Sequence, residues 1–424
     1  MQGWKRFLEL ASFVLRIIIS EKDTYIVRPA ISYLARISAG QPLLPAVQEI
    51  RCTGGSDVDT ILLSVAGPSL RKLIIRGDYC DWRTTLSTSD AVQRLLYRLP
   101  QRTPDLRSLC ACASNLKYSQ DVGSSIRSLR RLRSLRVYWS SGSLRELLDD
   151  YLSVVSSLED LRDLTLSIAK WGEVTLPNVS GFPPMRRLCL SGWGSNAYAS
   201  SIPALYPLTA SVPIEFLEVQ DIPLHPGDER SVVKEYATIV SDLLATCAIT
   251  LTVVKLDLGT SSFACIPAST LLQPLKQLRR LRVCDIYWRD GLKFGAGDLG
   301  EAASAWPQLM TFVLSWCWWG EMDTAPHFAD VVHFMCACSR LAELQLPALA
   351  MGNEIPVDHD AIYTIPITCS VDEDSVHDPT RLARLLRSLL PKLRNIDKAL
   401  KGAGPKWSVV LTELKKLILY SISR

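Results

Sequence analysis

Hydrophobic residues recur along the chain in the pattern L-x-x-L-x-L, where L is leucine or another apolar residue and x is usually polar. A single copy is a weak signal because leucine is common, but many copies at roughly even spacing predict leucine-rich repeats. Each repeat has an apolar edge that it cannot bury alone, so stacked repeats share one continuous core. Full copies begin at Val47, Leu70, Leu106, Leu132, Leu161, Met185, Ile214, Val253, Leu278, Leu309 and Leu341, and a partial copy begins at Leu393.

The segments between the copies predict helices, because apolar residues recur in them at helical spacing. This spacing is found over residues 89–104, 144–158, 228–247 and 324–340. The expected fold is therefore α/β: an irregular leucine-rich-repeat solenoid, in which parallel strands form a curved ladder with helical or irregular returns.

The same pattern divides the chain into four regions. Residues 1–46 are expected to form an N-terminal helical lead-in or cap, and residues 47–346 the solenoid. Residues 347–380 are rich in acidic groups and predict a loop-like insert, and residues 381–424 predict a C-terminal helical cap that holds the last partial repeat.

Polar residues between the apolar positions are the first candidates for partner binding, because side chains alternate between the two faces of a strand. They carry both charge signs, which favours a protein partner over a phosphate backbone. A solvated face that binds nothing specific stays open as the alternative. The candidates are Lys72, Arg136, Tyr138, Arg187, Glu218, Asp257, Arg280 and Arg282.

Tryptophans that follow the predicted strands are the second candidates. Trp139, Trp316, Trp318 and Trp319 are proposed as partner contacts, because exposed tryptophans are frequent binding hot spots. The alternative is that they fill gaps between irregular returns inside the core.

Composition limits the possible partners. The net charge is only +4, from 47 basic and 43 acidic residues, whereas nucleic-acid-binding domains usually carry a marked basic excess. Glu9 and Arg16 interrupt the N-terminal apolar stretch, so neither a membrane span nor a secretory signal is expected. We therefore expect no nucleic-acid or membrane partner, and an intracellular protein, cytoplasmic or nuclear, with reduced thiols.

No catalytic, cofactor or metal site is expected. The five histidines are scattered, and no G-x-S-x-G, P-loop or H-E-x-x-H motif accompanies them. Cys110 and Cys112 form a C-x-C pair without a second pair at zinc-finger spacing. Cys110 and Cys189 occupy outward strand positions and are expected to be the more accessible thiols. The acidic triplets 358–360 and 372–374 lack the spacing of a calcium loop and are expected to be solvated.

Several segments along the chain resemble the fungal (basidiomycete-type) F-box proteins with leucine-rich repeats. WKRFLELASFVLRII (4–18) resembles the segment that follows the F-box in that family, and ISAGQPLLPAVQEIRC (37–52) resembles the first repeat and its lead-in. RLPQRTPDLRSL, ASAWPQLMTFVLSW, FMCACSRLAELQLPA and SVHDPTRLARLLRSLLPKLRNI resemble successive family segments in the same order.

The resemblance implies a non-enzymatic protein-recognition scaffold that acts like the substrate receptor of a cullin-type ubiquitin ligase. The F-box that precedes the Trp4 segment in the family is missing from the sequence, so binding of a ligase adaptor is expected only if an F-box lies upstream. Two alternatives stay open: a stand-alone leucine-rich-repeat interaction protein with no ligase role, and an enzyme of unfamiliar α/β fold.

Overall fold

The computed structural model divides the chain into two compact units, Met1–Ile214 and Glu215–Arg424, called the first and the second unit below. It describes residues 2–53, 58–76, 85–112, 116–139, 150–168, 182–192, 212–223, 229–259, 265–288, 291–316, 325–346 and 367–369, together with the single residues 383, 409, 412, 413 and 416.

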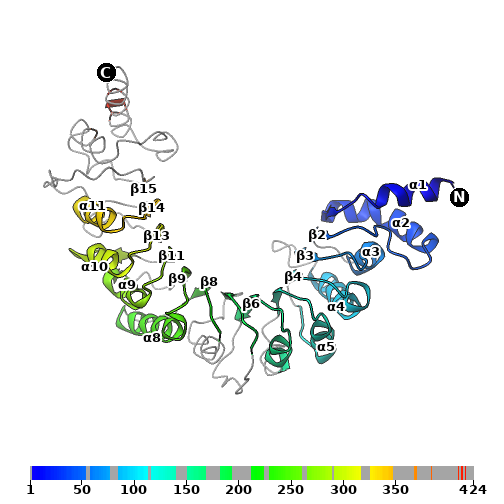
Figure 1. Ribbon diagram of the computed structural model, residues 1–424, viewed down its shortest axis with the longest axis horizontal. Coiled ribbons are helices and arrows are strands. Elements are labelled where there is room, and N and C mark those ends of the chain that lie inside the picture. Colours follow the sequence, from blue (N-terminus) through cyan, green and yellow to red (C-terminus); the bar gives the residue numbers. More distant parts are fainter. Residues whose placement is uncertain are drawn as a thin grey trace. The chain divides into compact units, whose positions relative to one another are not determined.

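Strands and helices alternate along the first unit (Figure 1). Its elements are α1 (Gln2–Ala11), β1 (Arg16–Ile19), α2 (Glu21–Ile37), β2 (Glu49–Thr53), α3 (Val58–Val65), β3 (Lys72–Arg76), α4 (Thr85–Arg102), β4 (Ser108–Cys112), α5 (Gln120–Ser128), β5 (Ser134–Tyr138), β6 (Asp163–Ile168) and β7 (Arg187–Gly192). Residues 150–156, between β5 and β6, are also helical. Strands β1 to β7 pair in sequence order, and each of these pairs is parallel.

The second unit repeats this arrangement. Its elements are β8 (Phe216–Pro223), α8 (Glu229–Cys247), β9 (Val253–Gly259), β10 (Ile266–Pro267), α9 (Ala268–Leu272), the 3₁₀ helix η2 (Gln273–Gln277), β11 (Val283–Trp288), β12 (Leu292–Lys293), α10 (Asp298–Ala305), β13 (Thr311–Trp316), α11 (Phe328–Ala337), β14 (Glu343–Leu346) and β15 (Ile367–Cys369). Strands β8, β9, β11, β13, β14 and β15 pair in parallel in that order, and β10 pairs with β12. Across the described ranges of both units, no helix is long and apolar enough to cross a bilayer.

The parallel pairing places equivalent repeat positions side by side. Leu73, Leu109, Leu135 and Leu164 are paired from strand to strand, and none of them is more than 1% exposed. Burying one such side chain stabilises the fold by about 1.5–3 kcal/mol. Figure 1 shows α3, α4 and α5 together on one side of the strands of the first unit. The strands alternate apolar and polar residues, as expected for a sheet that is covered on one face only.

The predicted α/β class is confirmed, with parallel strands and helical returns in both units. The helices expected over 89–104, 228–247 and 324–340 correspond to α4, α8 and α11. Nine of the eleven full copies are in the correct phase, because their first, fourth and sixth residues are buried. This ladder is consistent with leucine-rich repeats.

Two copies were assigned the wrong phase. In β9 and β11 the first buried position of the repeat is Leu251 and Leu281, not Val253 and Leu278. Val253 and Val283 pair with each other at the position that Thr311 occupies in β13, which points away from the helices. Extra apolar residues next to each copy make the pattern fit in more than one register. Leu278 is buried as well, but at the end of η2.

Two strands of the parallel ladder lie where none was expected. The N-terminal region contains α1 and α2 as expected, but also β1, which pairs with β2 from Arg16 to Ile19. Within the expected loop-like insert, β15 pairs with β14. The partial copy at Leu393 lies outside the described residues.

Candidate functional site

The face of the sheet that the helices leave uncovered, called the sheet face below, is basic in the first unit. Register pairing identifies the side chains that point from each strand to this face. Among its described strand positions, six residues are basic and two are acidic. The basic residues are Arg16, Arg51, Lys72, Arg76, Arg136 and Arg187, and the acidic residues are Glu49 and Asp163.

The sheet face of the second unit has the opposite character. Its described strand positions carry one basic residue, Lys255, and four acidic residues, Glu218, Asp257, Asp285 and Glu343. Lys255 is ion-paired with Asp285 at 3.3 Å. The near-neutral charge of the whole chain therefore hides two faces of opposite sign.

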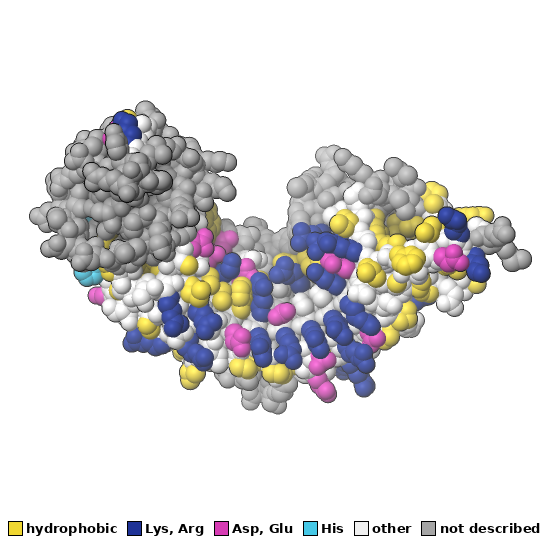
Figure 2. Space-filling view, turned by 45° about the horizontal axis from the view of Figure 1, so that its top comes forward, with side chains coloured by type: hydrophobic (Ala, Val, Ile, Leu, Met, Phe, Trp, Pro, Cys, Tyr) yellow, Lys and Arg dark blue, Asp and Glu magenta, His cyan; other side chains and the backbone are white. Residues whose placement is uncertain are grey.

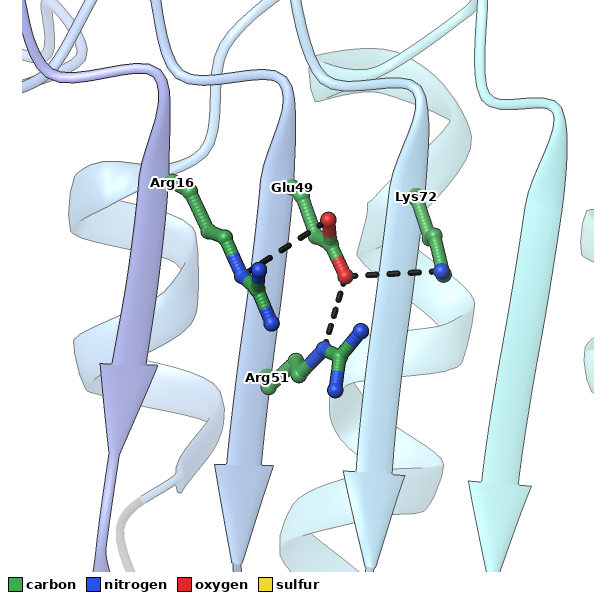
Figure 3. A network of polar contacts seen from close by, with 4 residues as sticks. All are labelled: Arg16, Glu49, Arg51 and Lys72. Carbon is green, nitrogen blue, oxygen red and sulfur yellow. Dashed lines mark hydrogen bonds and ion pairs between the residues drawn. The ribbon is translucent and has the colours of Figure 1, made fainter. Parts of the chain in front are cut away.

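Glu49 lies at the centre of a cluster of three cations in the first unit (Figure 3). Arg51 donates a hydrogen bond from Nε to Glu49 Oε1 at 2.7 Å, and Lys72 Nζ lies 3.4 Å from the same oxygen. Arg16 Nε lies 3.7 Å from Glu49 Oε2. The Arg51 hydrogen bond, with the charges of Lys72 and Arg16, lowers the pKa of Glu49 below its ordinary value. Three positive charges facing one carboxylate leave this corner of the sheet with a net positive charge.

A second basic feature lies in the turns that precede the strands. The second residue of five consecutive repeats is arginine, and we call these residues the arginine row: Arg71, Arg107, Arg133, Arg162 and Arg186. Four of the five are exposed, and Arg71 is half-buried. Figure 2 shows lysine and arginine side chains gathered in rows on the face in view, with acidic side chains between them.

Backbone hydrogen bonds hold the arginine row in register. The N–H of each arginine, from Arg107 onward, donates to the carbonyl oxygen of the previous arginine at 2.7–2.8 Å. Neighbouring members are therefore one strand spacing apart, about 4.8 Å. Asp105 is an acidic group next to this row, ion-paired with Arg71 at 3.1 Å and with Arg131 at 2.8 Å. At the equivalent positions the second unit has Glu215, Thr252, Arg282, Met310 and Ala342, so the row belongs to the first unit.

A cluster of thiols and polar groups occupies the middle of the same sheet face. Cys110 and Cys112 project from β4, with their Sγ atoms 3.6 Å apart. Arg136 lies beside Cys110 on β5, and Tyr138 lies beside Cys112. Burial raises the pKa of Tyr138 above its ordinary value. Cys189, expected to be accessible, points to this face but is fully buried, because neighbouring side chains cover it.

The expected tryptophan contacts are core residues where the structure describes them. Trp139 is 4% exposed and Trp316 is 5% exposed, so neither is available as a partner anchor. Trp139 packs edge-on against Tyr118 and Tyr151, with ring centroids 5.1 and 5.7 Å away. Trp316 contacts Phe294. Trp318 and Trp319 lie outside the described residues, as do the two acidic triplets.

The other expected contacts divide into three groups. Lys72, Arg136, Tyr138, Arg187 and Asp257 lie on the sheet faces and are partly exposed, as expected. Glu218 points to the sheet face but is 9% exposed and accepts a hydrogen bond from Gln220 Nε2 at 2.7 Å. The expected strand positions of Arg280 and Arg282 were wrong because of the misassigned phase: both are exposed, but they lie in the turn before β11.

A pocket of about 420 Å³ lies between α4 and α5, on the helix side of the first unit. Its lining includes Asp90, Arg94, Arg98 and Asp121, but no thiol or imidazole group. Arg94 is already engaged by Asp59, with Nε 2.8 Å from Oδ2. These groups give no reason to assign a reaction to the pocket.

No family model matches the chain. No curated protein matches it either. Among solved structures, the chain is similar to a Bacteroides fragilis protein from a structural genomics project, with 11% identity over 65% of this chain and 68% of that chain and a TM-score of 0.31. It is also similar to TLR13 in a TLR13–ssRNA13 complex, with 13% identity over 82% of this chain but only 39% of that chain and a TM-score of 0.29. TM-scores this low do not establish a shared fold.

The arginine row was not predicted from the sequence, because only the third, fifth and seventh residues of each repeat were expected to point outward, and the row occupies the second. Its signal is nevertheless visible in the sequence. The second position of every copy from Leu70 to Met185 is arginine, whereas the other full copies carry it at this position only once, at Arg282 in the correct phase. Aligning the copies by their buried positions makes the row apparent.

Proposed function

We propose that this chain is a non-enzymatic protein-recognition scaffold, built as an irregular, curved leucine-rich-repeat solenoid. Its partner is a protein with an acidic surface, which docks on the arginine row and the adjoining sheet face of the first unit. The observation that carries the proposal is the alignment of five arginines in consecutive repeats, fixed by backbone hydrogen bonds.

Charge complementarity supports an acidic partner. Four of the five guanidinium groups are exposed, and arginine binds carboxylates with paired, geometrically specific hydrogen bonds. Lys72, Arg76 and Arg136 extend the same charge onto the strands. A row of positive charges speeds association with a partner that has an acidic surface, and it disfavours partners that have a basic surface.

A protein partner is favoured over single-stranded nucleic acid for two reasons. Binding of single strands relies on exposed aromatic platforms, and the described tryptophans that follow the strands are buried. The acidic residues Glu49 and Asp163 also lie among the cations of the sheet face, so the face is not a uniformly basic track for a phosphate backbone.

The resemblance to fungal F-box proteins extends the proposal. On that basis the partner is a substrate, and the chain acts like the receptor component of a cullin-type ubiquitin ligase inside the cell. Adaptor binding requires an F-box encoded upstream of the Trp4 segment. A stand-alone interaction protein without a ligase role uses the same surface and differs only in this point.

The binding surface is tested with a fluorescent polyglutamate peptide, by anisotropy at low and at physiological salt. The variant Arg107→Glu/Arg133→Glu/Arg162→Glu is expected to weaken binding by about tenfold or more, equivalent to about 1.4 kcal/mol. The matched control is Arg279→Glu/Arg280→Glu/Arg282→Glu, which reverses three exposed arginines in the second unit and makes the same change in net charge. It is expected to retain wild-type affinity.

Equal weakening by both triple variants would show that net charge alone governs binding, and would overturn the site. A single-stranded RNA oligomer with the same charge as the peptide is measured in the same way. If it binds more tightly than polyglutamate, and only the first variant loses this binding, the choice of a protein partner is overturned. The ligase role is tested separately, by co-purification of the adaptor with the product of the complete gene. Failure of that step removes the ligase role and leaves the recognition surface in place.

A further inference from the structure

Two thiols on β4 are close enough to react with each other. Cys110 and Cys112 are separated by one residue, so they project from the same face of the strand, and their Sγ atoms lie 3.6 Å apart. Cys110 is partly exposed, whereas Cys112 is 2% exposed. A reagent from solution therefore reacts with Cys110 first, and the Cys112 thiol lies next to the product.

Cations surround this pair. Arg136 on β5 lies beside Cys110, and Arg76 on β3 lies beside Cys112. Arg136 is held in place by a hydrogen bond from its Nε to Thr165 Oγ1 at 3.1 Å. Lys72 is the third cation whose charge acts on Cys110. Reactive cysteines in proteins are typically found in such electropositive, partly exposed surroundings.

The electrostatic effect is opposite to that on other cysteines of the chain. The hydrogen bond between Cys112 and Cys110, with the charges of Arg136, Arg76 and Lys72, lowers the pKa of Cys110 to about 7 despite partial burial. Burial instead raises the pKa of Cys52 and Cys338 to about 12. Near neutral pH a substantial fraction of Cys110 is therefore the nucleophilic thiolate, while these two remain thiols.

We propose that Cys110 and Cys112 form a redox-reactive dithiol, in which Cys110 attacks a small disulfide that carries carboxylates and Cys112 resolves the product. The cations around the pair select the anionic disulfide. The pair lies on the sheet face that forms part of the proposed docking surface and shares its cations. Its reaction with a small disulfide, however, does not require a protein partner.

The reaction proceeds in two exchange steps. The Cys110 thiolate attacks one sulfur of the disulfide RS–SR, forming the mixed disulfide Cys110–S–SR and releasing the thiolate RS⁻. Cys112 then attacks Cys110 Sγ, which forms the Cys110–Cys112 disulfide and releases the second RS⁻, while the Cys112 proton passes to solvent. The two cysteine thiols are oxidised, and the small disulfide is reduced to two thiols.

The extended strand limits the stability of the product. Two Cα atoms separated by one residue in a strand are about 6.6 Å apart, near the upper limit of about 6.8 Å for a disulfide. Closing the bond therefore bends β4 and gives a disulfide that is easily reduced. The pair suits a reversible switch on the sheet face better than a permanent cross-link.

The experiment treats the folded protein with glutathione disulfide at pH 7 and follows it by intact mass and peptide mapping. Wild type is expected to lose two hydrogens, located at Cys110 and Cys112. Cys112→Ser is expected to retain one glutathione at Cys110, and Cys110→Ser to show neither product over the same period. Cys265 is the control: it is the more exposed thiol, yet Cys265→Ser is expected to react at the wild-type rate.

Charge selection is tested with cystamine, a cationic disulfide. Arg76→Gln/Arg136→Gln is expected to slow the reaction of glutathione disulfide about tenfold or more, and to slow cystamine much less. Reaction at Cys265 before Cys110, or reaction of Cys110→Ser with glutathione disulfide at the wild-type rate, would overturn the dithiol. Equal slowing of the two disulfides would overturn the selection of an anionic one. Loss of the preference for Cys110 in urea is expected, because the preference depends on the folded strand.

Discussion

Arg136 donates a hydrogen bond from Nε to Oγ1 of Thr165 at 3.1 Å, which links neighbouring strands β5 and β6 across the sheet face. Thr165 is 6% exposed, so the acceptor oxygen belongs to a buried side chain of the sheet face. The Arg136 side chain therefore lies along the sheet toward β6, and its charge also acts on Cys110, its neighbour on β4. Its neighbours in the chain, Leu135 and Val137, point the other way, into the core.

This alternation predicts opposite effects of substitution at adjacent positions. Leu135→Asp is expected to lower the free energy of unfolding by more than about 4 kcal/mol, because it removes a core side chain and buries an unpaired carboxylate. Arg136→Ala removes one part-buried hydrogen bond and is expected to cost about 0.5–1.5 kcal/mol. Urea unfolding followed by circular dichroism measures both. A larger loss from Arg136→Ala would mean that the strand phase is wrong.

Gly123 in α5 is predicted to reverse the usual effect of a helical Gly→Ala change. Alanine normally stabilises a helix by about 0.5–1 kcal/mol relative to glycine. Here a Cβ would collide with Tyr118 Oη, which donates a hydrogen bond to Asp150 Oδ2 at 2.7 Å. Gly123→Ala is therefore expected to destabilise by about 1–3 kcal/mol.

Two measurements check the cause of this effect. Gly300→Ala in α10 is the matched control, because no atom lies within 4 Å of its added Cβ, and it is expected to raise the melting temperature. In a Tyr118→Phe background, Gly123→Ala is expected to cost less than in wild type, because the colliding oxygen is gone. An equal loss of stability from Gly123→Ala in both backgrounds would contradict the proposed collision.

Trp139 is predicted to contribute to stability and not to binding. Its ring is packed between Tyr118 and Tyr151, so Trp139→Ala is expected to cost about 3–5 kcal/mol of folding free energy. Trp139→Phe retains much of the packing and is expected to cost clearly less. Thermal unfolding of both variants tests the packing, and polyglutamate affinity tests the role. If Trp139→Phe is as stable as wild type but binds polyglutamate more weakly, Trp139 contributes to binding after all.

Glu49 predicts a pH-dependent contribution to stability. Its pKa in the folded chain lies below the ordinary value of about 4.5. At a pH between the folded-state pKa and 4.5, the unfolded chain therefore binds more protons at Glu49 than the folded chain does. The stabilisation is present above pH 4.5 and is lost as the pH falls through the folded-state pKa. The stability difference between wild type and Glu49→Gln is expected to be below about 1 kcal/mol at pH 7, and to shrink below pH 4.5 and in high salt. A difference that grows on acidification would contradict the ion pairs.

The repeat pattern was sufficient to predict the class of fold, because nine copies have apolar residues at each inward position. It failed for β11, since LRRLRV from Leu278 fits the leucine pattern better than LRVCDI from Leu281. The latter has Cys284 at a leucine position, yet Cys284 is fully buried. Pairing with β9 and β13 determines the phase, and such non-local hydrogen bonds leave little trace in the local sequence.

The burial of the tryptophans could have been predicted by continuing the alternation of inward and outward positions beyond the repeat pattern. Trp139 and Trp316 each lie two residues after the last apolar position of a repeat, which is again an inward position. Strand β1 was not predictable in this way. Its Ile18 is 65% exposed, so local hydrophobicity does not distinguish the buried residues of this short strand from the exposed one.

Photo-crosslinking determines whether an acidic partner docks on the arginine row. A polyglutamate peptide with a benzophenone group is bound to the folded protein, irradiated, and the crosslinked peptides are identified by mass spectrometry. Docking on this row predicts crosslinks in peptides from the turns and strands at residues 71–76, 107–112, 133–138, 162–168 and 186–192. Crosslinks concentrated at residues 279–288 or on the helices α3, α4 and α5 would contradict it.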